Sequence, residues 1–323
     1  MIRLSDGVRL VEVERSSVVE SVHTGHLVVL GADGEVSFLL GDPSQPMFAR
    51  SSLKPVQAVG MLRAGLRLAP AELALAASSH SGSPQHLGLI AGMLADGGLS
   101  EDDLDCPPDL PSGVRERRAY LASGHTERRL AMNCSGKHTA MLLTCLAHAN
   151  DPCIDWPLSG YLTPSHPLQQ SLAATVAEFT GAPIAAVGVD GCGAPLFGAS
   201  LLGLARAFHR LATGAGPEAQ VAGAIRGFPE LVGGQGRQVT ELMRAIPGLL
   251  AKDGAEGVYA AALPDGGTVA VKIDDGSMRA ADCAIGWALH HLGVPTEVLE
   301  PLARQPVLGG GEPVGLVRPA PGW

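Results

Sequence analysis

The residues of this chain with the clearest chemical potential are Ser51 and Lys54, a serine and a lysine three positions apart. They lie in Ala-Arg-Ser-Ser-Leu-Lys-Pro at positions 49–55, which opens an apolar stretch. Because residues three apart share one face of a helical turn, Lys54 can approach the Ser51 hydroxyl. A serine needs a base to act as a nucleophile, and a lysine whose pKa is lowered by burial can provide one. The alternative, which spacing alone favours, is an N-cap serine followed by an exposed lysine.

A second serine–lysine pair is predicted across the same site. Lys252-Asp253-Gly254 precedes an expected late strand, and a late Lys-x-Gly facing Ser-x-x-Lys is similar to the arrangement in serine β-lactamases and penicillin-binding proteins. The serine that faces Lys252 would come from the helical region. The candidate is the segment 77–82, Ala-Ser-Ser-His-Ser-Gly, for which a helix-terminating loop rich in side-chain caps is the alternative.

Two cysteines stand in polar, glycine-rich surroundings, which is unusual for free thiols. Cys134 belongs to Asn-Cys-Ser-Gly-Lys-His at 133–138, and Cys192 to Asp-Gly-Cys-Gly at 190–193. Thiolates near a lysine are soft metal ligands, and zinc is the expected occupant. The chain has neither C-x-x-C nor H-E-x-x-H spacing, so buried inert thiols, as expected for Cys145 and Cys283, are the alternative.

The elements that must position these residues form hairpins at both ends and helices between them. Apolar runs with glycine-rich turns predict hairpins at 26–40 and 258–273, the second followed by a helix that stops at Gly293. Proline at the start and glycine after the end predict a helix over 167–180. Pro55 places a helix start at Ser51 or Ser52. A short buried strand at 184–189 and a loosely packed tail at 308–323 complete the prediction.

This pattern predicts an α+β fold in which both termini build one antiparallel sheet and a helical region is inserted between them. The expected division is a sheet-containing domain of residues 1–48 plus 247–323, and a mainly helical domain of residues 49–246 that carries the chemical motifs. With 323 residues and 46% hydrophobic content, the chain can bury a sizeable core.

Charge and hydrophobicity exclude several classes of function. The net charge of −9 argues against a nucleic-acid partner. No run of about 18 apolar residues is present, which argues against a membrane span. The first 14 residues lack the apolar core of a signal peptide, so a cytoplasmic location is expected. Six thinly spread cysteines without a secretion signal argue against a disulfide framework.

Taken in order, the motifs resemble those of the Rhizobium-type (asparaginase II) L-asparaginases. Besides the motifs at 49–55, 79–82, 133–138 and 190–192, they include Ser-His-Pro-Leu-Gln at 165–169 and Gly-Gln-Gly-Arg at 234–237. The resemblance runs from about residue 19 to 276. It implies a β-lactamase-like fold, a homodimer, and hydrolysis of L-asparagine to L-aspartate and ammonia.

The resemblance also assigns roles to individual residues of this chain. It pairs Ser51 with Lys54 and Ser79 with Lys252 as two catalytic tandems. It implies zinc ligands, namely Cys134, Lys137 and Cys192. It implies a substrate-binding set, in which Asp190 fixes the α-amino group of the substrate with support from Arg50 and His80.

The sequence departs from the family pattern at three positions. Val239 stands where a cysteine near the site is expected, Ser83 where a glutamate is common, and Lys252 is matched by its place before a strand rather than by a strict motif. These departures bear on substrate preference and efficiency. The alternatives are a glutaminase, which would leave the cysteine pair unexplained, a penicillin-recognising hydrolase, and a catalytically silent amino-acid or zinc sensor of the same fold.

Overall fold

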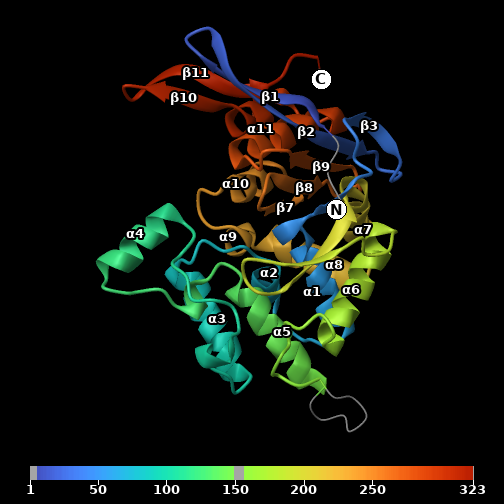
Figure 1. Ribbon diagram of the computed structural model, residues 1–323, viewed down its shortest axis with the longest axis vertical. Coiled ribbons are helices and arrows are strands. Elements are labelled where there is room, and N and C mark those ends of the chain that lie inside the picture. Colours follow the sequence, from blue (N-terminus) through green and yellow to red (C-terminus); the bar gives the residue numbers. More distant parts are fainter. Residues whose placement is uncertain (1–5, 149–155, 323) are drawn as a thin grey trace.

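The computed structural model describes residues 6–148 and 156–322. Its main sheet has eight antiparallel strands in the order β10-β11-β1-β2-β9-β8-β7, with β3 paired to β2 (Figure 1). The chain termini therefore meet in one sheet, as predicted. The strands are β1 Val8–Arg15, β2 Val18–Leu30, β3 Val36–Leu40, β7 Leu250–Gly254, β8 Val258–Ala262, β9 Thr268–Ile273, β10 Gln305–Gly309 and β11 Glu312–Pro319.

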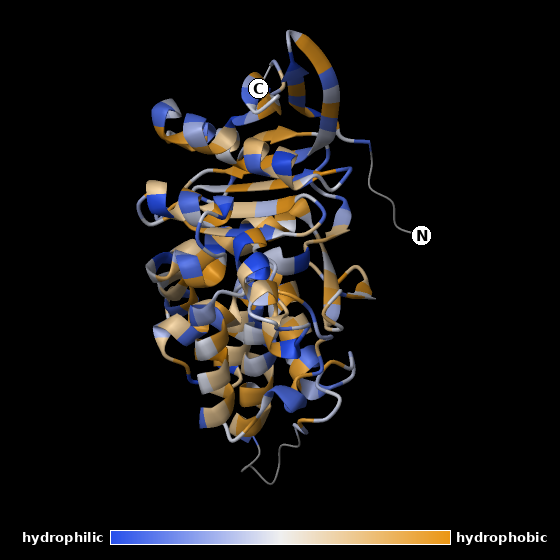
Figure 2. Ribbon diagram, turned by 90° about the vertical axis from the view of Figure 1, so that its left-hand side faces the viewer, coloured by the Kyte–Doolittle hydropathy of each residue, from blue (hydrophilic) through white to orange (hydrophobic). Residues whose placement is uncertain are grey.

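The centre of this sheet is covered on both faces. Every residue of β8 and β9 is buried, and helices α7 (Leu201–Thr213) and α11 (Met278–Ala288) pack against both strands. A strand that is apolar throughout needs cover on each face. The buried hydrophobic residues of the sheet and of the helices beneath it form one continuous core. Figure 2 shows the central strands of the sheet mainly in the hydrophobic colour.

The helical region lies below the sheet in Figure 1. It also contains a small three-stranded sheet in the order β4-β6-β5 (Pro46–Phe48, Pro195–Ser200, Val187–Val189). None of the described helices is long and apolar enough to cross a membrane. The remaining helices are α1 Lys54–Arg63, α2 Pro70–Ala76, α3 Pro84–Asp96, α4 Val114–Ala122, α5 Ser135–His148, α6 Pro167–Thr180, α8 Pro217–Gly227, α9 Pro229–Val232, α10 Gln238–Ala245 and α12 Thr296–Ala303.

Elements with strong local signals agree with the prediction. Helix α6 spans the predicted residues and ends at Gly181, whose φ of 71° is the left-handed conformation of a glycine cap. The hairpins β2-β3 and β8-β9 form in the predicted places. The five cysteines within the described residues are free and buried, and Cys153 lies outside those residues. The division into two domains stays a prediction.

Three predictions about local structure are wrong. The strand expected at 184–189 is only β5, and it is not buried, since Val187 and Val189 are 52% and 76% exposed at a sheet edge. The tail expected to pack loosely instead forms most of the hairpin β10-β11, and β11 pairs with β1. Helix α1 begins at Lys54, because a 3-10 turn, η1 (Arg50–Leu53), comes before it.

Candidate active site

The 3-10 turn η1 sets the direction of Arg50, Ser51 and Lys54. Arg50 has a φ of 52°, a left-handed conformation that is costly for a residue with a Cβ. Such strained residues concentrate at functional sites. Pro55 stands in the first turn of α1, where its missing N–H costs nothing. The chain thus turns sharply at Arg50 and presents Ser51 just before the helix.

Strand β7 lies against η1 because of a glycine. A Cβ on Gly254 would come within 2.6 Å of the Ala49 carbonyl oxygen and 2.7 Å of Ser52 Oγ. The close approach lets Ser52 Oγ donate to the Lys252 carbonyl oxygen at 3.4 Å. This explains physically why a glycine follows Lys252 by two positions: it brings the lysine strand up to the serine turn.

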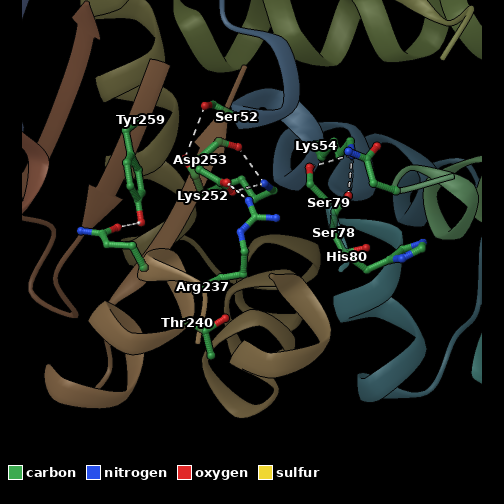
Figure 3. Close-up of polar contacts among 12 residues, drawn as sticks. Ser52, Lys54, Ser78, Ser79, His80, Arg237, Thr240, Lys252, Asp253 and Tyr259 are labelled. Atoms are coloured by element: carbon green, nitrogen blue, oxygen red, sulfur yellow. Dashed lines mark hydrogen bonds and ion pairs between the residues drawn. The ribbon is translucent and has the colours of Figure 1, made fainter. Parts of the chain in front are cut away.

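Lys54 is buried and its amine contacts three acceptors. Nζ donates to the Ser78 carbonyl oxygen at 2.5 Å and to Ser79 Oγ at 3.0 Å (Figure 3). It also donates to Cys134 Sγ at 3.0 Å. Lys54 therefore pairs with the serine that was predicted to partner Lys252. Among the described residues, the Ser51 hydroxyl has no hydrogen-bond partner.

Lys252 is also fully buried, but its partner is a carboxylate. Nζ donates to Asp253 Oδ1 at 2.6 Å and to the Asp253 carbonyl oxygen at 2.7 Å. The other carboxylate oxygen accepts a 2.5 Å hydrogen bond from Arg237. Burial lowers the pKa of Lys252, Asp253 opposes that shift, and the result is about 8. A lysine with this pKa can hold or release a proton near neutral pH.

Asp190 and Arg50 form a pair beside Ser51. The Arg50 Nε and NH2 groups donate to Asp190 Oδ1 at 3.0 and 2.8 Å. Burial alone would raise the pKa of Asp190, but the positive charges of Lys137 and Arg50 outweigh it and lower the pKa. Asp190 is thus a fixed negative charge, as a group that binds an ammonium requires.

The three predicted zinc ligands lie together. Lys137 Nζ donates to Cys192 Sγ at 3.2 Å, and Cys192 lies close enough to Cys134 to affect the pKa of its thiol. Helix α5 brings Cys134 and Lys137 here because Gly136 lets it approach the Leu75 carbonyl oxygen, which a Cβ would meet at 2.6 Å.

Two thiols and an amine are a donor set that zinc accepts, so these residues fit the ion. The Cys192 thiol, with Lys54 and Lys137 nearby, lowers the pKa of Cys134. Burial would lower the pKa of Lys137, but the two thiols raise it to about 12, so zinc binding would have to displace a proton from this amine. No group of three or more His, Cys, Asp or Glu side chains poised for a metal occurs within residues 6–148 and 156–322. A lysine would therefore have to complete the set.

Ser51 lies where two cavities meet. A narrow polar recess is lined by Ser51 together with Arg50, Lys54, Lys137 and Asp190. A wider cleft of about 430 Å³ reaches the other side of Ser51. Its lining includes Ser51, Ser79, Asn133, Arg237 and Asp253. A third cavity of about 500 Å³ lies beyond Arg50 along β4 and β6, and its lining is mostly apolar.

His80 is placed behind the site rather than in it. Its side chain is fully buried, its Nε2 hydrogen-bonds with Ser135 Oγ at 2.9 Å, and its ring stacks on His86. Figure 3 shows the ring directed away from Lys54. This geometry gives no support to the predicted contact between His80 and the substrate. It suits a residue that holds the segment around Ser79 in place.

Sequence reasoning assigned no role to Arg237 or Asp253, which line the cleft. Both stand in motifs that were noted, Gly-Gln-Gly-Arg and Lys-Asp-Gly. The signal in the sequence that could have indicated Asp253 was its place directly after the candidate lysine, Lys252. The departure at Val239 is a buried side chain that also lines the cleft.

Known proteins resemble this chain in sequence and in structure. The family model described as L-asparaginase II matches residues 11–319, nearly the whole chain. No curated protein matches the sequence. Among solved structures, a β-lactamase from Mycobacterium bovis is similar at 14% identity and a TM-score of 0.45, over 84% of this chain and 95% of the other.

Proposed function

The chain belongs to the L-asparaginase II family, and on that premise we propose that it hydrolyses L-asparagine to L-aspartate and ammonia through an acyl-enzyme on Ser51. The observation that carries the choice of nucleophile is the position of Ser51. Its hydroxyl has no partner among the described residues, and it lies at the junction of the polar recess and the wider cleft. A substrate amide in the wider cleft would reach this oxygen, whereas the recess, at about 10 Å³, has room for no more than a water molecule.

The two predicted tandems divide the proton transfers between them in this proposal. Ser51 attacks the side-chain carbonyl carbon of the substrate and transfers its proton to neutral Lys54, whose amine then gives up one of its three contacts. Lys54 keeps this proton, so the proton for the leaving nitrogen comes from the second pair. Ser79, with Lys252 behind it, protonates the nitrogen as the C–N bond breaks and ammonia leaves. Water then hydrolyses the ester on Ser51 by the same groups in reverse.

The polar recess, at about 10 Å³, would have to widen to admit the amino-acid end of the substrate. Asp190 is the negative group there, and Arg50 fixes its orientation through two hydrogen bonds. An α-ammonium bound to Asp190 beside Ser51 would hold the side-chain amide near the nucleophile. Orientation of this kind accounts for a large part of enzymatic rate enhancement.

Zinc, held by Cys134, Lys137 and Cys192, would add a fixed positive charge that orients the substrate beside the recess. The protein residues carry the covalent chemistry in this proposal. A homodimer and a cytoplasmic location, which the sequence predicts, belong to the same proposal and are checked by the solution mass and by the location of a tagged protein.

The decisive experiment is ammonia release from L-asparagine and, separately, from L-glutamine by the wild type, Ser51→Ala and Ser79→Ala. We expect asparagine turnover that falls by about 10³-fold or more in Ser51→Ala, because the nucleophile is lost. Brief mixing followed by intact-mass measurement should show the aspartyl adduct in the wild type and in Ser79→Ala. Ser123→Ala, which changes an exposed serine directly after α4, is the matched control.

The same assay separates the alternatives. Glutamine turnover above asparagine turnover would make the protein a glutaminase, since the two substrates differ by one methylene. Near-normal turnover in Ser51→Ala would remove the nucleophile assignment. The absence of ammonia from both amides, with and without zinc, would favour the silent binding protein.

A further inference from the structure

A chain of three charged side chains joins the cleft wall to the buried amine of Lys252. Arg237 donates to one oxygen of Asp253 at 2.5 Å, and Lys252 donates to the other at 2.6 Å (Figure 3). Arg237 and Asp253 line the cleft beside Ser51 and Ser79, whereas Lys252 is fully buried behind them. The carboxylate is thus the only link among the described ion pairs between Lys252 and another charge.

We propose that Asp253 is a positioning residue for Lys252, held in turn by Arg237, and that the three side chains form one unit which sets where the Lys252 amine lies and in which pH range it delivers a proton. The inference rests on the proposed function, in which Ser79 and Lys252 protonate the leaving group. Arg237 and Asp253 act through Lys252 in this scheme and need not touch the substrate.

The backbone around each member makes the unit rigid. Lys252 and Asp253 are consecutive residues of β7, and they pair with Ala260 and Tyr259 of β8. The loop before Arg237 packs on the segment that carries Ser79, because a Cβ on Gly234 would come within 2.3 Å of Ser81 Oγ. Gly234 also has a φ of 134°, which disfavours other residues. The side chains therefore meet at positions fixed by a strand and by a tight loop.

The hydrogen-bond count of Lys252 agrees with a role in proton delivery. An ammonium has three donors, and Asp253 accepts two of them, one at its carboxylate and one at its carbonyl oxygen. The third donor has no partner among the described residues. Because Asp253 fixes two of the three directions, it also restricts the direction of the third.

The charges around Lys252 act in opposite senses. Burial lowers its pKa first, Asp253 then raises it, and Lys54 and Arg237 lower it, with a net value of about 8. Asp282 on α11 and Tyr259 on β8 complete the set of titratable groups at this cluster. Since the proton donor must be charged before it donates, activity should be lost as pH rises through the pKa of Lys252.

Replacing Asp253 and replacing Arg237 should therefore move the alkaline limit of activity in opposite directions. In Asp253→Asn, the loss of a negative charge favours neutral Lys252, so the limit should fall by about one pH unit or more. In Arg237→Gln, the full charge of Asp253 acts on Lys252, so the limit should rise. Arg237→Lys keeps the positive charge and should restore the wild-type limit.

The test measures kcat and KM for ammonia release from L-asparagine between pH 6 and 10, and titrates the Lys252 ε-carbon by NMR in protein labelled with ¹³C-lysine. Lys252→Arg identifies the resonance. We expect kcat to fall about tenfold or more in Asp253→Asn while KM changes little, since proton transfer rather than binding is affected. Glu300→Gln, which breaks the surface pair with Arg304, is the matched control and should leave both readouts unchanged.

The two readouts keep this inference separate from the proposed function. If the wild type releases no ammonia, the proposed function fails, and the NMR titration still tests the unit. Shifts of the Lys252 titration in the same direction in both variants, or no shift in either, would overturn the inference. If Asp253→Asn does not fold, the upward shift in Arg237→Gln and its reversal in Arg237→Lys remain as the test.

Discussion

The strained turn at Arg50 makes a prediction in which stability and activity separate. Arg50 combines a left-handed backbone, with a φ of 52°, and a side chain that holds Asp190 through two hydrogen bonds. Replacement by alanine removes the side chain and keeps the strain. Replacement by glycine removes both. The pair Arg50→Ala and Arg50→Gly therefore measures the two properties independently.

The magnitudes follow from the structure. A left-handed conformation destabilises a residue with a Cβ by about 1–2 kcal/mol. Glycine avoids this strain, but its greater freedom in the unfolded chain lowers the free energy of unfolding by about 0.5–1 kcal/mol. Arg50→Gly should thus be more stable than Arg50→Ala by about 0.5–1 kcal/mol. The hydrogen bonds to the charged Asp190 contribute about 2–3 kcal/mol to its orientation, so both variants should lose about 30- to 150-fold in kcat/KM.

The assay compares urea unfolding and asparagine hydrolysis for the two variants. Ser17 is the matched control for the backbone, because this exposed residue between β1 and β2 has a φ of 68°. Ser17→Gly should likewise exceed Ser17→Ala in stability, with no change in kcat/KM. If Arg50→Ala keeps kcat/KM within about threefold of the wild type, Arg50 does not orient Asp190 for catalysis. Equal stability of Arg50→Ala and Arg50→Gly would refute the strain argument.

Two further predictions concern the metal and the pH dependence of stability. Protein dialysed against zinc should hold about one ion per chain by elemental analysis. Cys192→Ser should lose this ion, whereas the control Cys283→Ser should keep it. Retention of zinc by Cys192→Ser would exclude this ligand set. Burial, with Asp253 nearby, raises the pKa of Asp282 from 3.8 to about 7, so the folded state favours the neutral carboxyl and loses stability as pH rises between those values. Asp282→Asn should therefore raise the melting temperature relative to the wild type at pH 8 but not at pH 4; an equal change at both would show that ionisation is not the cause.

The sequence predicted those parts of the fold that are governed by local rules. Helix α6 and the hairpins β2-β3 and β8-β9 carry their own start, stop and turn residues, so their positions needed no knowledge of distant contacts. The hairpin β10-β11 was missed because its stability comes from pairing with β1, about 300 residues away, and its glycines and prolines are those of a loop. Non-local pairing of this kind leaves no periodic signal.

The same distinction explains what could be predicted of the site. The motifs identified Ser51, Lys54, Ser79 and Lys252, and the structure brings all four to one region. The pairing within this set depends on where each lysine amine ends, which is decided by acceptors far away in the sequence. The Lys54 amine donates to the Ser78 carbonyl oxygen and to Ser79 Oγ. The three-residue spacing between Ser51 and Lys54, in a 3-10 turn, therefore did not determine the partner of Lys54.

The different partners of the two buried lysines support different roles for them. Lys252 is bound to the carboxylate of Asp253, which stabilises its protonated form. Among the described residues, Lys54 forms no ion pair with a carboxylate, and it contacts the Ser79 hydroxyl directly. A pair of titratable groups in unlike environments is the usual arrangement for an acid and a base in one site. In the proposed mechanism, Lys54 would accept the proton of Ser51, and Lys252 would keep its proton until the leaving nitrogen requires it.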